Sequence, residues 1–233
     1  INAWDTSNVT NMSRMFWSTY DFNQDINNWD VSSVTNMQGM FAFNYTNTKS
    51  FNLSTWDVSN VTNMSQMFRR TQFNEDITSW NTSSVTTISE MFRNNTIFNQ
   101  DISGWDTSSV TGMSYVFDTA TAFNQPIGSW NTSSVNRMDE MFDKATAFNQ
   151  NLSNWNITSL NFTISLNNFL FNGTLSTANY DALLIGWSAQ TPITNGLSPN
   201  FGNSQYTLGG AAEAARNTLI NTYGWTITDG GGI

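Results

Sequence analysis

Apolar residues recur from the N-terminus to about Leu160 with a period of about 25 residues, which lies in the range of known structural repeats. Tryptophan occupies one fixed place in each unit, at Trp4, Trp29, Trp56, Trp80, Trp105, Trp130 and Trp155. The spacing varies little, and the longest interval separates Trp29 from Trp56. A period of this length indicates a stack of repeats, because a single unit of this size cannot bury its apolar face alone.

Two apolar patterns alternate within each unit. The pattern V-x-x-M-x-x-M-F, first seen at residues 9–16, places apolar residues at i, i+3, i+6 and i+7 and predicts a short α- or 3₁₀-helix. The pattern I-x-x-W-[DN]-[TV]-S, as in residues 26–32, is short and carries β-branched and aromatic residues, so it predicts a strand. The serine at its end stands where a helix N-cap is expected. Each unit is therefore predicted to contain one strand, one cap and one short helix around a core of Trp, Met and Phe.

The repeat pattern ends near Leu160, and a different segment follows it. Residues 176–187 predict a capped helix, residues 209–223 a second helix that ends at Gly224, and residues 225–228 a short strand. We therefore predict a solenoid of about seven coils over residues 1–168 and a C-terminal capping module over residues 169–233. The predicted fold class is an α+β repeat with a C-terminal α/β cap.

The composition excludes several classes of function. The chain of 233 residues has no His and no Cys, which removes Ser-His and Cys-His nucleophiles, disulfides and thiolate metal sites. The net charge of −9 disfavours nucleic acid and anionic lipid as partners. No stretch approaches the roughly 18 apolar residues that indicate a membrane-spanning helix. We expect a protein that is not an enzyme, has no metal or other cofactor, and does not insert into a membrane.

The unit F-N-Q-D-I-S-x-W-D-T-S-x-V-T-x-M-S-x-M-F resembles the repeat of BspA-type leucine-rich-repeat surface proteins, first noted in mycoplasma lipoproteins. The resemblance covers about residues 1–160, and the segment YDALLIGW at 180–187 looks like part of the module that often follows such repeats. It implies a leucine-rich-repeat-like solenoid in an extracellular, often adhesive protein, and it transfers no catalytic residues. Trp, Met and Phe replace the usual Leu, so the coils are not expected to share the shape of ordinary leucine-rich repeats. Ile1 falls within a unit, so we expect an export signal to precede it.

A column of polar residues follows the tryptophans and forms the candidate binding site. Its members are Asp5, Asp30, Asp57, Asn81, Asp106 and Asn131. Strand alternation predicts that they lie opposite the tryptophans as an exposed ladder of acceptors for a protein, a glycan or Ca²⁺. Alternatively, each side chain caps its own turn by accepting hydrogen bonds from backbone N–H groups.

Two further columns bear on function. The asparagines of the F-N-Q motif are predicted to bond the backbone of neighbouring coils, and they are Asn23, Asn74, Asn99, Asn124 and Asn149. A Thr/Val column raises the possibility of ice binding, and it contains Thr6, Val31, Val58, Thr82, Thr107 and Thr132. This column is predicted to be buried on the tryptophan side, which argues against ice binding.

Two functions remain open from the sequence. The first is an extracellular, cell-surface adhesion or recognition module that presents one face of the repeat to a protein or glycan on another cell or in the matrix. The second is a structural spacer, or a subunit that joins neighbouring copies of itself in a surface stalk or extracellular filament.

Overall fold

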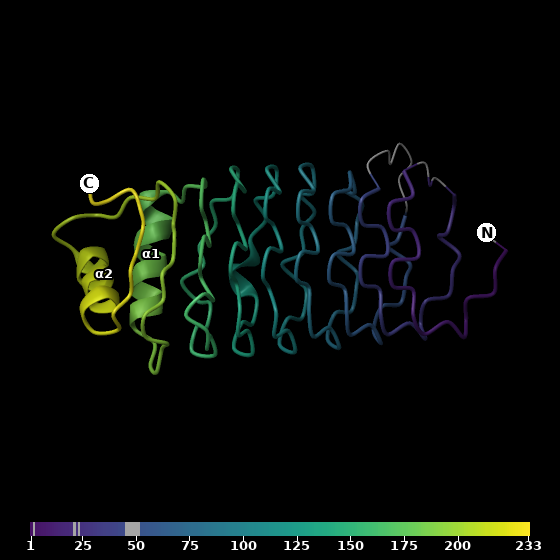
Figure 1. Ribbon diagram of the computed structural model, residues 1–233, viewed down its shortest axis with the longest axis horizontal. Coiled ribbons are helices and arrows are strands. Elements are labelled where there is room, and N and C mark those ends of the chain that lie inside the picture. The colour runs from purple at the N-terminus through teal and green to yellow at the C-terminus, as the bar shows by residue number, and fades with distance from the viewer. Residues whose placement is uncertain (2, 21, 23, 45–51) are drawn as a thin grey trace.

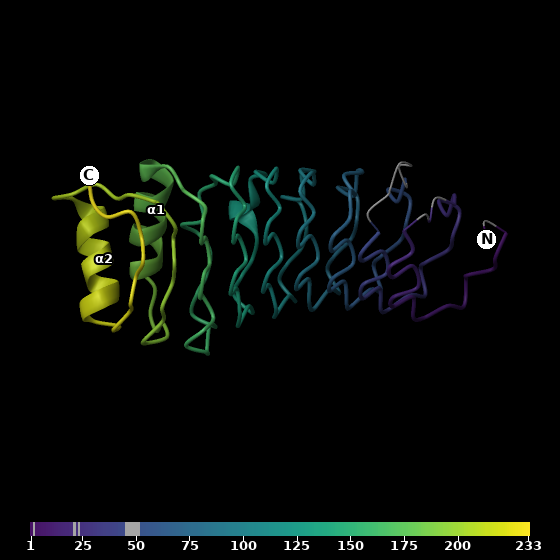
Figure 2. The same cartoon turned by 45° about the horizontal axis from the view of Figure 1, so that its top comes forward.

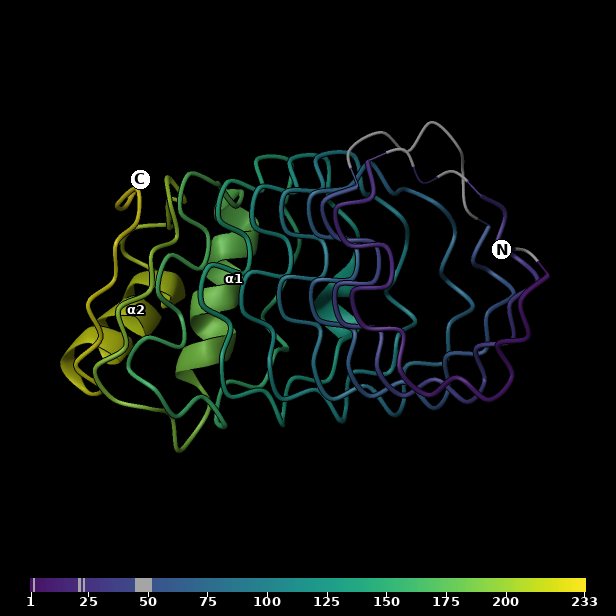
Figure 3. The same ribbon diagram turned by 45° about the vertical axis from the view of Figure 1, so that its right-hand side comes forward.

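The protein forms an elongated stack of irregular coils that ends in two helices. The computed structural model describes residues 1, 3–20, 22, 24–44 and 52–233, and the predictions for Asn23 and for residues 45–51 lie outside them. The chain runs from the N-terminal coil to the C-terminal helices in sequence order (Figure 1). A turned view shows that successive coils overlie one another (Figure 3).

The predicted fold class, a leucine-rich-repeat-like α+β solenoid of strand and short-helix coils with an α/β cap, is wrong. The described residues contain no strand, and their only β pairing consists of isolated bridges. Their helices are a 3₁₀-helix η1 (Ile127–Ser129) and two α-helices, α1 (Thr177–Ser188) and α2 (Ala211–Asn221). Both α-helices lie at the C-terminal end of the stack (Figures 1 and 2).

The V-x-x-M-x-x-M-F segment is a ribbon of successive turns rather than a helix. The amide of Met15 donates to the carbonyl of Met12, whereas the amides of Met12 and Phe16 donate to Asn36 and Met40 of the next coil at 2.9 and 2.8 Å. Arg14 and Ser18 adopt the left-handed conformation, with φ of 56° and 57°, which a right-handed helix does not allow. Turns that close every three residues repeat the side-chain direction at i+3, so the apolar spacing imitates that of a helix.

The I-x-x-W-[DN]-[TV]-S segment contains two successive turns rather than a strand. In one coil, the amide of Trp29 donates to the carbonyl of Ile26 at 3.1 Å, and the amide of Val34 donates to that of Val31 at 2.9 Å. The Asp, Asn, Ser and Gly residues between the apolar positions favour turns and prevail over the β-branched residues. The predicted serine N-caps therefore precede no helix.

The core is continuous and consists of stacked columns of large side chains. The aromatic column of the ribbons stacks in register, with ring centroids 5.8 Å apart between Phe68 and Phe92 and again between Phe92 and Phe117. The tryptophans from Trp29 to Trp155 are buried, whereas Trp4 in the first coil is 56% exposed. Each buried indole N–H donates to a carbonyl of the preceding coil, as Trp105 does to Ile77 at 3.2 Å. The Thr/Val column is also buried, as predicted.

The C-terminal helices agree with the sequence prediction, but the final strand does not. The hydroxyl of Ser176 accepts a hydrogen bond from the amide of Asn179 and caps α1, and Gly224 takes a left-handed conformation after α2. Residues 225–228 form no strand, and Thr228 makes only an isolated bridge. One apolar cluster runs from Met12 through Trp225, so the division at residue 168 stays a prediction.

Candidate binding surfaces

The Asp/Asn column lies in exposed turns, and its acceptors are used inside those turns. Asp30 Oδ1 accepts hydrogen bonds from the Ser32 amide at 3.0 Å and the Ser32 hydroxyl at 2.6 Å. The same acceptor role, for the amide of the serine two residues later, is played by Asp5, Asp57, Asn81, Asp106 and Asn131. The prediction that these side chains cap their turns is confirmed, and they do not form a ladder along a strand. Binding of a partner by this column stays a prediction.

These bonds favour the ionised form of the aspartates. The side-chain hydrogen bond from Ser32, and then the bond from its amide, lower the pKa of Asp30. Neighbouring coils oppose this slightly, because the negative charge of Asp5 raises the pKa of Asp30. We call the exposed turns that hold the Asp/Asn column the turn edge. It carries negative charges at Asp5, Asp30, Asp57 and Asp106 at neutral pH, with the neutral Asn81 between Asp57 and Asp106.

The F-N-Q asparagines form a ladder between coils, as predicted. Asn99 Oδ1 accepts from the amide of Asn124 at 2.9 Å, and the side-chain amide of Gln125 donates to the Asn99 carbonyl at 2.8 Å. The ladder continues into α1, where the amide of Ser176 and the side chain of Asn179 bond to Asn149. These amides hold the coils together and are not free to bind a ligand.

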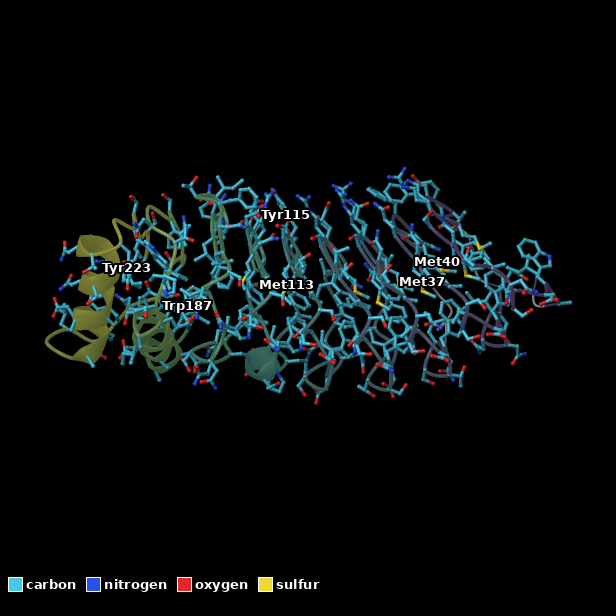
Figure 4. The ribbon with its side chains drawn as sticks, turned by 90° about the horizontal axis from the view of Figure 1, so that it is seen from below. Met37, Met40, Met113, Tyr115, Trp187 and Tyr223 are labelled. Atoms are coloured by element: carbon cyan, nitrogen blue, oxygen red, sulfur yellow. The ribbon has the colours of Figure 1, made fainter. Side chains whose placement is uncertain are left out.

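Most of the positive charge of the chain gathers on one side of the stack. We define the ribbon face as the outward side chains of residues 11–18, 36–43, 63–70, 87–94, 112–119 and 137–144. It carries six of the eight basic residues of the chain: Arg14, Arg69, Arg70, Arg93, Arg137 and Lys144. Tyr115 lies on this side in Figure 4, where nitrogen-tipped side chains gather along its edge and oxygen-tipped ones along the opposite edge.

Three carboxylates of the ribbon face, Asp118, Asp139 and Asp143, are more deeply buried than the cations paired with them. Arg93 bonds Asp118 at 2.8 Å and Glu90 at 3.0 Å, and its guanidinium lies 4.4 Å from the ring centroid of Tyr115. Burial opposes ionisation of Glu90, but hydrogen bonds from Gln66 and Arg93 and nearby positive charges outweigh it and lower its pKa. The exposed layer of the ribbon face is consequently more basic than its composition suggests.

Towards the N-terminal end the ribbon face carries arginines stacked on aromatic rings. The guanidinium of Arg14 lies 5.0 Å from the Trp17 ring centroid, and those of Arg69 and Arg70 lie 5.2 and 5.3 Å from that of Phe43. The Trp17 and Phe43 rings are themselves 4.8 Å apart. We call these five residues the arginine–aromatic patch. Within the described part of the chain, Arg14 and Arg70 form no ion pair.

The chain contains two pairs of adjacent acidic residues, Glu75-Asp76 and Asp139-Glu140, and members of both pairs make hydrogen bonds or ion pairs within the fold. Asp76 accepts hydrogen bonds from the amide and hydroxyl of Thr78, and Asp139 is paired with Arg137 at 2.9 Å. Glu140 accepts from the hydroxyl of Tyr115 at 3.1 Å. Among the described residues, no group of three or more acidic side chains is placed to hold a metal ion.

Comparison with known proteins places the chain in a family. The family described as "Mycoplasma protein of unknown function, DUF285" matches residues 1–86 and 69–177. The chain belongs to the DUF285 family. Searches of curated proteins and of solved structures each found no match.

The DUF285 match supports the mycoplasma-type repeat but not its identification as a BspA-type leucine-rich repeat. No helix in the described part of this DUF285 chain is long and apolar enough to cross a membrane. Sequence reasoning missed the ribbon face, although a signal was present. Six of the eight basic residues lie in the V-x-x-M-x-x-M-F segment or within two residues after it. This bias is visible once the units are aligned.

Proposed function

We propose that this DUF285 chain is a non-catalytic recognition module of a secreted or cell-surface protein. It binds a partner that carries anionic groups, either a protein or a glycan, through the arginine–aromatic patch. The observation that supports this most directly is the pairing of unneutralised Arg14 and Arg70 with the rings of Trp17 and Phe43. The resemblance of the repeat to BspA-type surface proteins supports the extracellular setting.

The chemistry of the patch favours a carboxylate, sulfate or phosphate ester. Guanidinium groups bind such anions bidentately, and an aromatic ring beneath holds the guanidinium plane in place. Rings of this kind also offer apolar area next to the charge, which suits the body of a sugar or a peptide side chain. The remaining charges outside the ribbon face in the described repeats are acidic, so an anionic partner is directed towards this face.

Surface plasmon resonance tests the proposal with immobilised sulfated and carboxylated polysaccharides and acidic matrix proteins as probes. We expect binding that weakens as salt rises and is lost in the double variant Arg14→Gln/Arg70→Gln. Lys144→Gln is the matched control, because it removes an exposed cation of the same face that does not stack on a ring. No binding to any anionic probe at low salt, or equal loss in the control, contradicts the proposal.

A second candidate function is side-by-side self-association, and the separation of charge favours it. The ribbon face exposes cations, whereas the turn edge exposes Asp5, Asp30, Asp57 and Asp106 at one position in the first, second, third and fifth units. Contact between unlike faces of two copies does not close, so it produces ribbons or filaments.

Analytical ultracentrifugation at low and high salt tests this second function. The variant Asp30→Asn/Asp57→Asn/Asp106→Asn removes charge but keeps the turn acceptors, as the native Asn81 and Asn131 do. We expect the wild type to associate at low salt and this variant to remain folded and monomeric. A wild type that stays monomeric at high concentration and low salt rules the function out.

A further inference from the structure

A depression lies where the last coil meets the C-terminal segments. It has a volume of about 260 Å³ and is lined by Phe171, Asn172, Asn200, Gly202, Asn203, Thr228 and Asp229. It belongs to neither the arginine–aromatic patch nor the Asp/Asn column.

Hydrogen bonds between three segments fix the base of the depression. The amide of Leu170 donates to the carbonyl of Asn200 at 2.8 Å, and the amide of Phe201 donates to that of Thr228 at 2.8 Å. Gly202 has a φ of 62°, and a Cβ on it would overlap the carbonyl oxygen of Gly173. Only glycine allows this close approach, so the depression is formed before any ligand arrives.

The depression carries no uncompensated charge. The side chain of Asp229 is buried, and its Oδ2 accepts hydrogen bonds from the Tyr180 hydroxyl at 2.7 Å and Arg216 Nε at 2.8 Å. Its Oδ1 accepts from the amide of Gly231 at 3.1 Å. The charge of Asp229 is therefore balanced by Arg216, and an ionic ligand finds no free counter-charge here.

The exposed lining combines an aromatic ring with uncommitted amides. Phe171 is 40% exposed, so part of its ring is open to a ligand in the depression. Within the described part of the chain, the side-chain amides of Asn172 and Asn203 make no hydrogen bond, and each offers donors and an acceptor. These three groups, with the hydroxyl of Thr228, surround one open space.

We propose that this depression is a binding site for one ring of a neutral saccharide. A pyranose ring has an apolar face of C–H groups that stacks on an aromatic ring, and its hydroxyls both donate and accept hydrogen bonds. Phe171 supplies the stacking surface, and Asn172, Asn203 and Thr228 supply partners for the hydroxyls. A lipid is a poor fit, because the depression lacks the apolar walls that enclose such ligands.

Saturation-transfer NMR on the full chain tests the proposal with glucose, galactose, mannose and N-acetylglucosamine as probes. We expect transfer from at least one of these sugars, and loss of it in Phe171→Ala. Titration of that sugar should show binding weakened by roughly tenfold in Asn203→Ala, which corresponds to about 1.4 kcal/mol. Phe162→Ala is the matched control, because Phe162 is also an exposed phenylalanine near the end of the stack but lies outside the depression.

The outcomes separate this site from the arginine–aromatic patch. Absence of transfer from all four neutral sugars overturns the proposal, as does a signal that survives Phe171→Ala or is lost equally in Phe162→Ala. The proposal is also overturned if Arg14→Gln/Arg70→Gln loses sugar binding and Phe171→Ala retains it. In that case the sugar binds at the arginine–aromatic patch. The helical circular-dichroism signal of the protein, which comes from α1 and α2, checks that each variant is folded.

Discussion

Trp187 of α1 donates its indole N–H to the carbonyl oxygen of Leu152 at 3.1 Å. The same bond joins Trp155 to Ile127 at 3.0 Å in the coil before it. The helix therefore places a tryptophan where the next coil of the repeat would place one, although its own backbone follows a different path. The tryptophan hydrogen bond of the repeat is in this way continued into the C-terminal segment.

Replacement of Trp187 is expected to destabilise the whole stack. Trp187→Phe keeps an aromatic ring but removes one of the two hydrogen bonds that the carbonyl of Leu152 accepts, the other coming from the Trp155 amide. Loss of one such bond costs about 0.5–1.5 kcal/mol. Urea unfolding measures this loss. Ile185→Ala, on the exposed side of the same helix, is the control and is expected to change the unfolding free energy by less than about 0.5 kcal/mol. Equal stability of Trp187→Phe and wild type contradicts the role of this bond.

The tryptophans of the repeat are expected to contribute different amounts to the free energy of unfolding, according to their place in the stack. Trp105 is buried and donates to Ile77, whereas Trp4 is largely exposed. The carbonyl of Ile77 also accepts from the Trp80 amide, so Trp105→Phe is expected to cost about 0.5–1.5 kcal/mol for the lost bond, and Trp4→Phe to have little effect. Thermal unfolding of the two variants side by side checks the difference. Comparable losses at both positions contradict the expectation that the buried hydrogen bond of Trp105 sets the cost.

The period and the core were accessible from the sequence, but the backbone path was not. The columns of Trp, Met, Phe and Val that the repeat predicts are largely buried, because apolar residues at a fixed place in each unit meet when units stack. The ribbon was missed because turns closing every three residues and a helix share the same apolar spacing. Left-handed positions are held by Arg14, Glu90 and Tyr115, and among the described residues of the ribbon face only Gly39 and Asn94 give the sequence signal that such positions usually show.

The candidate surfaces were predictable to different degrees. Asp and Asn two residues before Ser are typical of side-chain-capped turns, and this alternative could be stated before the structure was known. The clustering of Arg14 with Trp17 depends on the turn ribbon, and that of Arg70 with Phe43 also depends on how neighbouring coils stack. The depression joins Phe171 to Asn200 and Thr228, which are far apart in the sequence and which no local pattern brings together.

The asparagine ladder gives a test that separates hydrogen bonding from side-chain size. Asn124 Oδ1 accepts from the amide of Asn149 at 2.9 Å and from the side-chain amide of Gln150 at 2.7 Å. Asn124→Ala removes this acceptor and is expected to lower the unfolding free energy by about 1–2 kcal/mol. Asn124→Asp keeps an acceptor of the same shape and is expected to retain most of the stability. If the two variants lose the same amount in urea unfolding, the ladder contributes little.

Stability is expected to fall in acid because of the aspartates in the turns. Hydrogen bonds from the side chains of Ser or Thr, and then from their amides, lower the pKa values of six aspartates. They are Asp5, Asp30, Asp57, Asp76, Asp101 and Asp106. A carboxyl whose pKa is lower in the folded state stabilises the fold above its unfolded pKa, which is about 3.9 for aspartate, and this contribution is lost as the pH falls through the folded value. The melting temperature should therefore be steady near neutral pH and fall in acid.

Two variants with opposite expected effects check this origin of the acid sensitivity. Asp30→Asn/Asp57→Asn/Asp106→Asn retains the turn acceptors without titrating, so its melting temperature should fall less steeply below about pH 5. Burial raises the pKa of Asp143, so its protonation favours the folded state as the pH falls, and Asp143→Asn should make the acid loss steeper. Thermal unfolding between neutral and acidic pH measures both slopes. A triple variant that loses stability as steeply as the wild type shows that groups outside these turns control the acid transition.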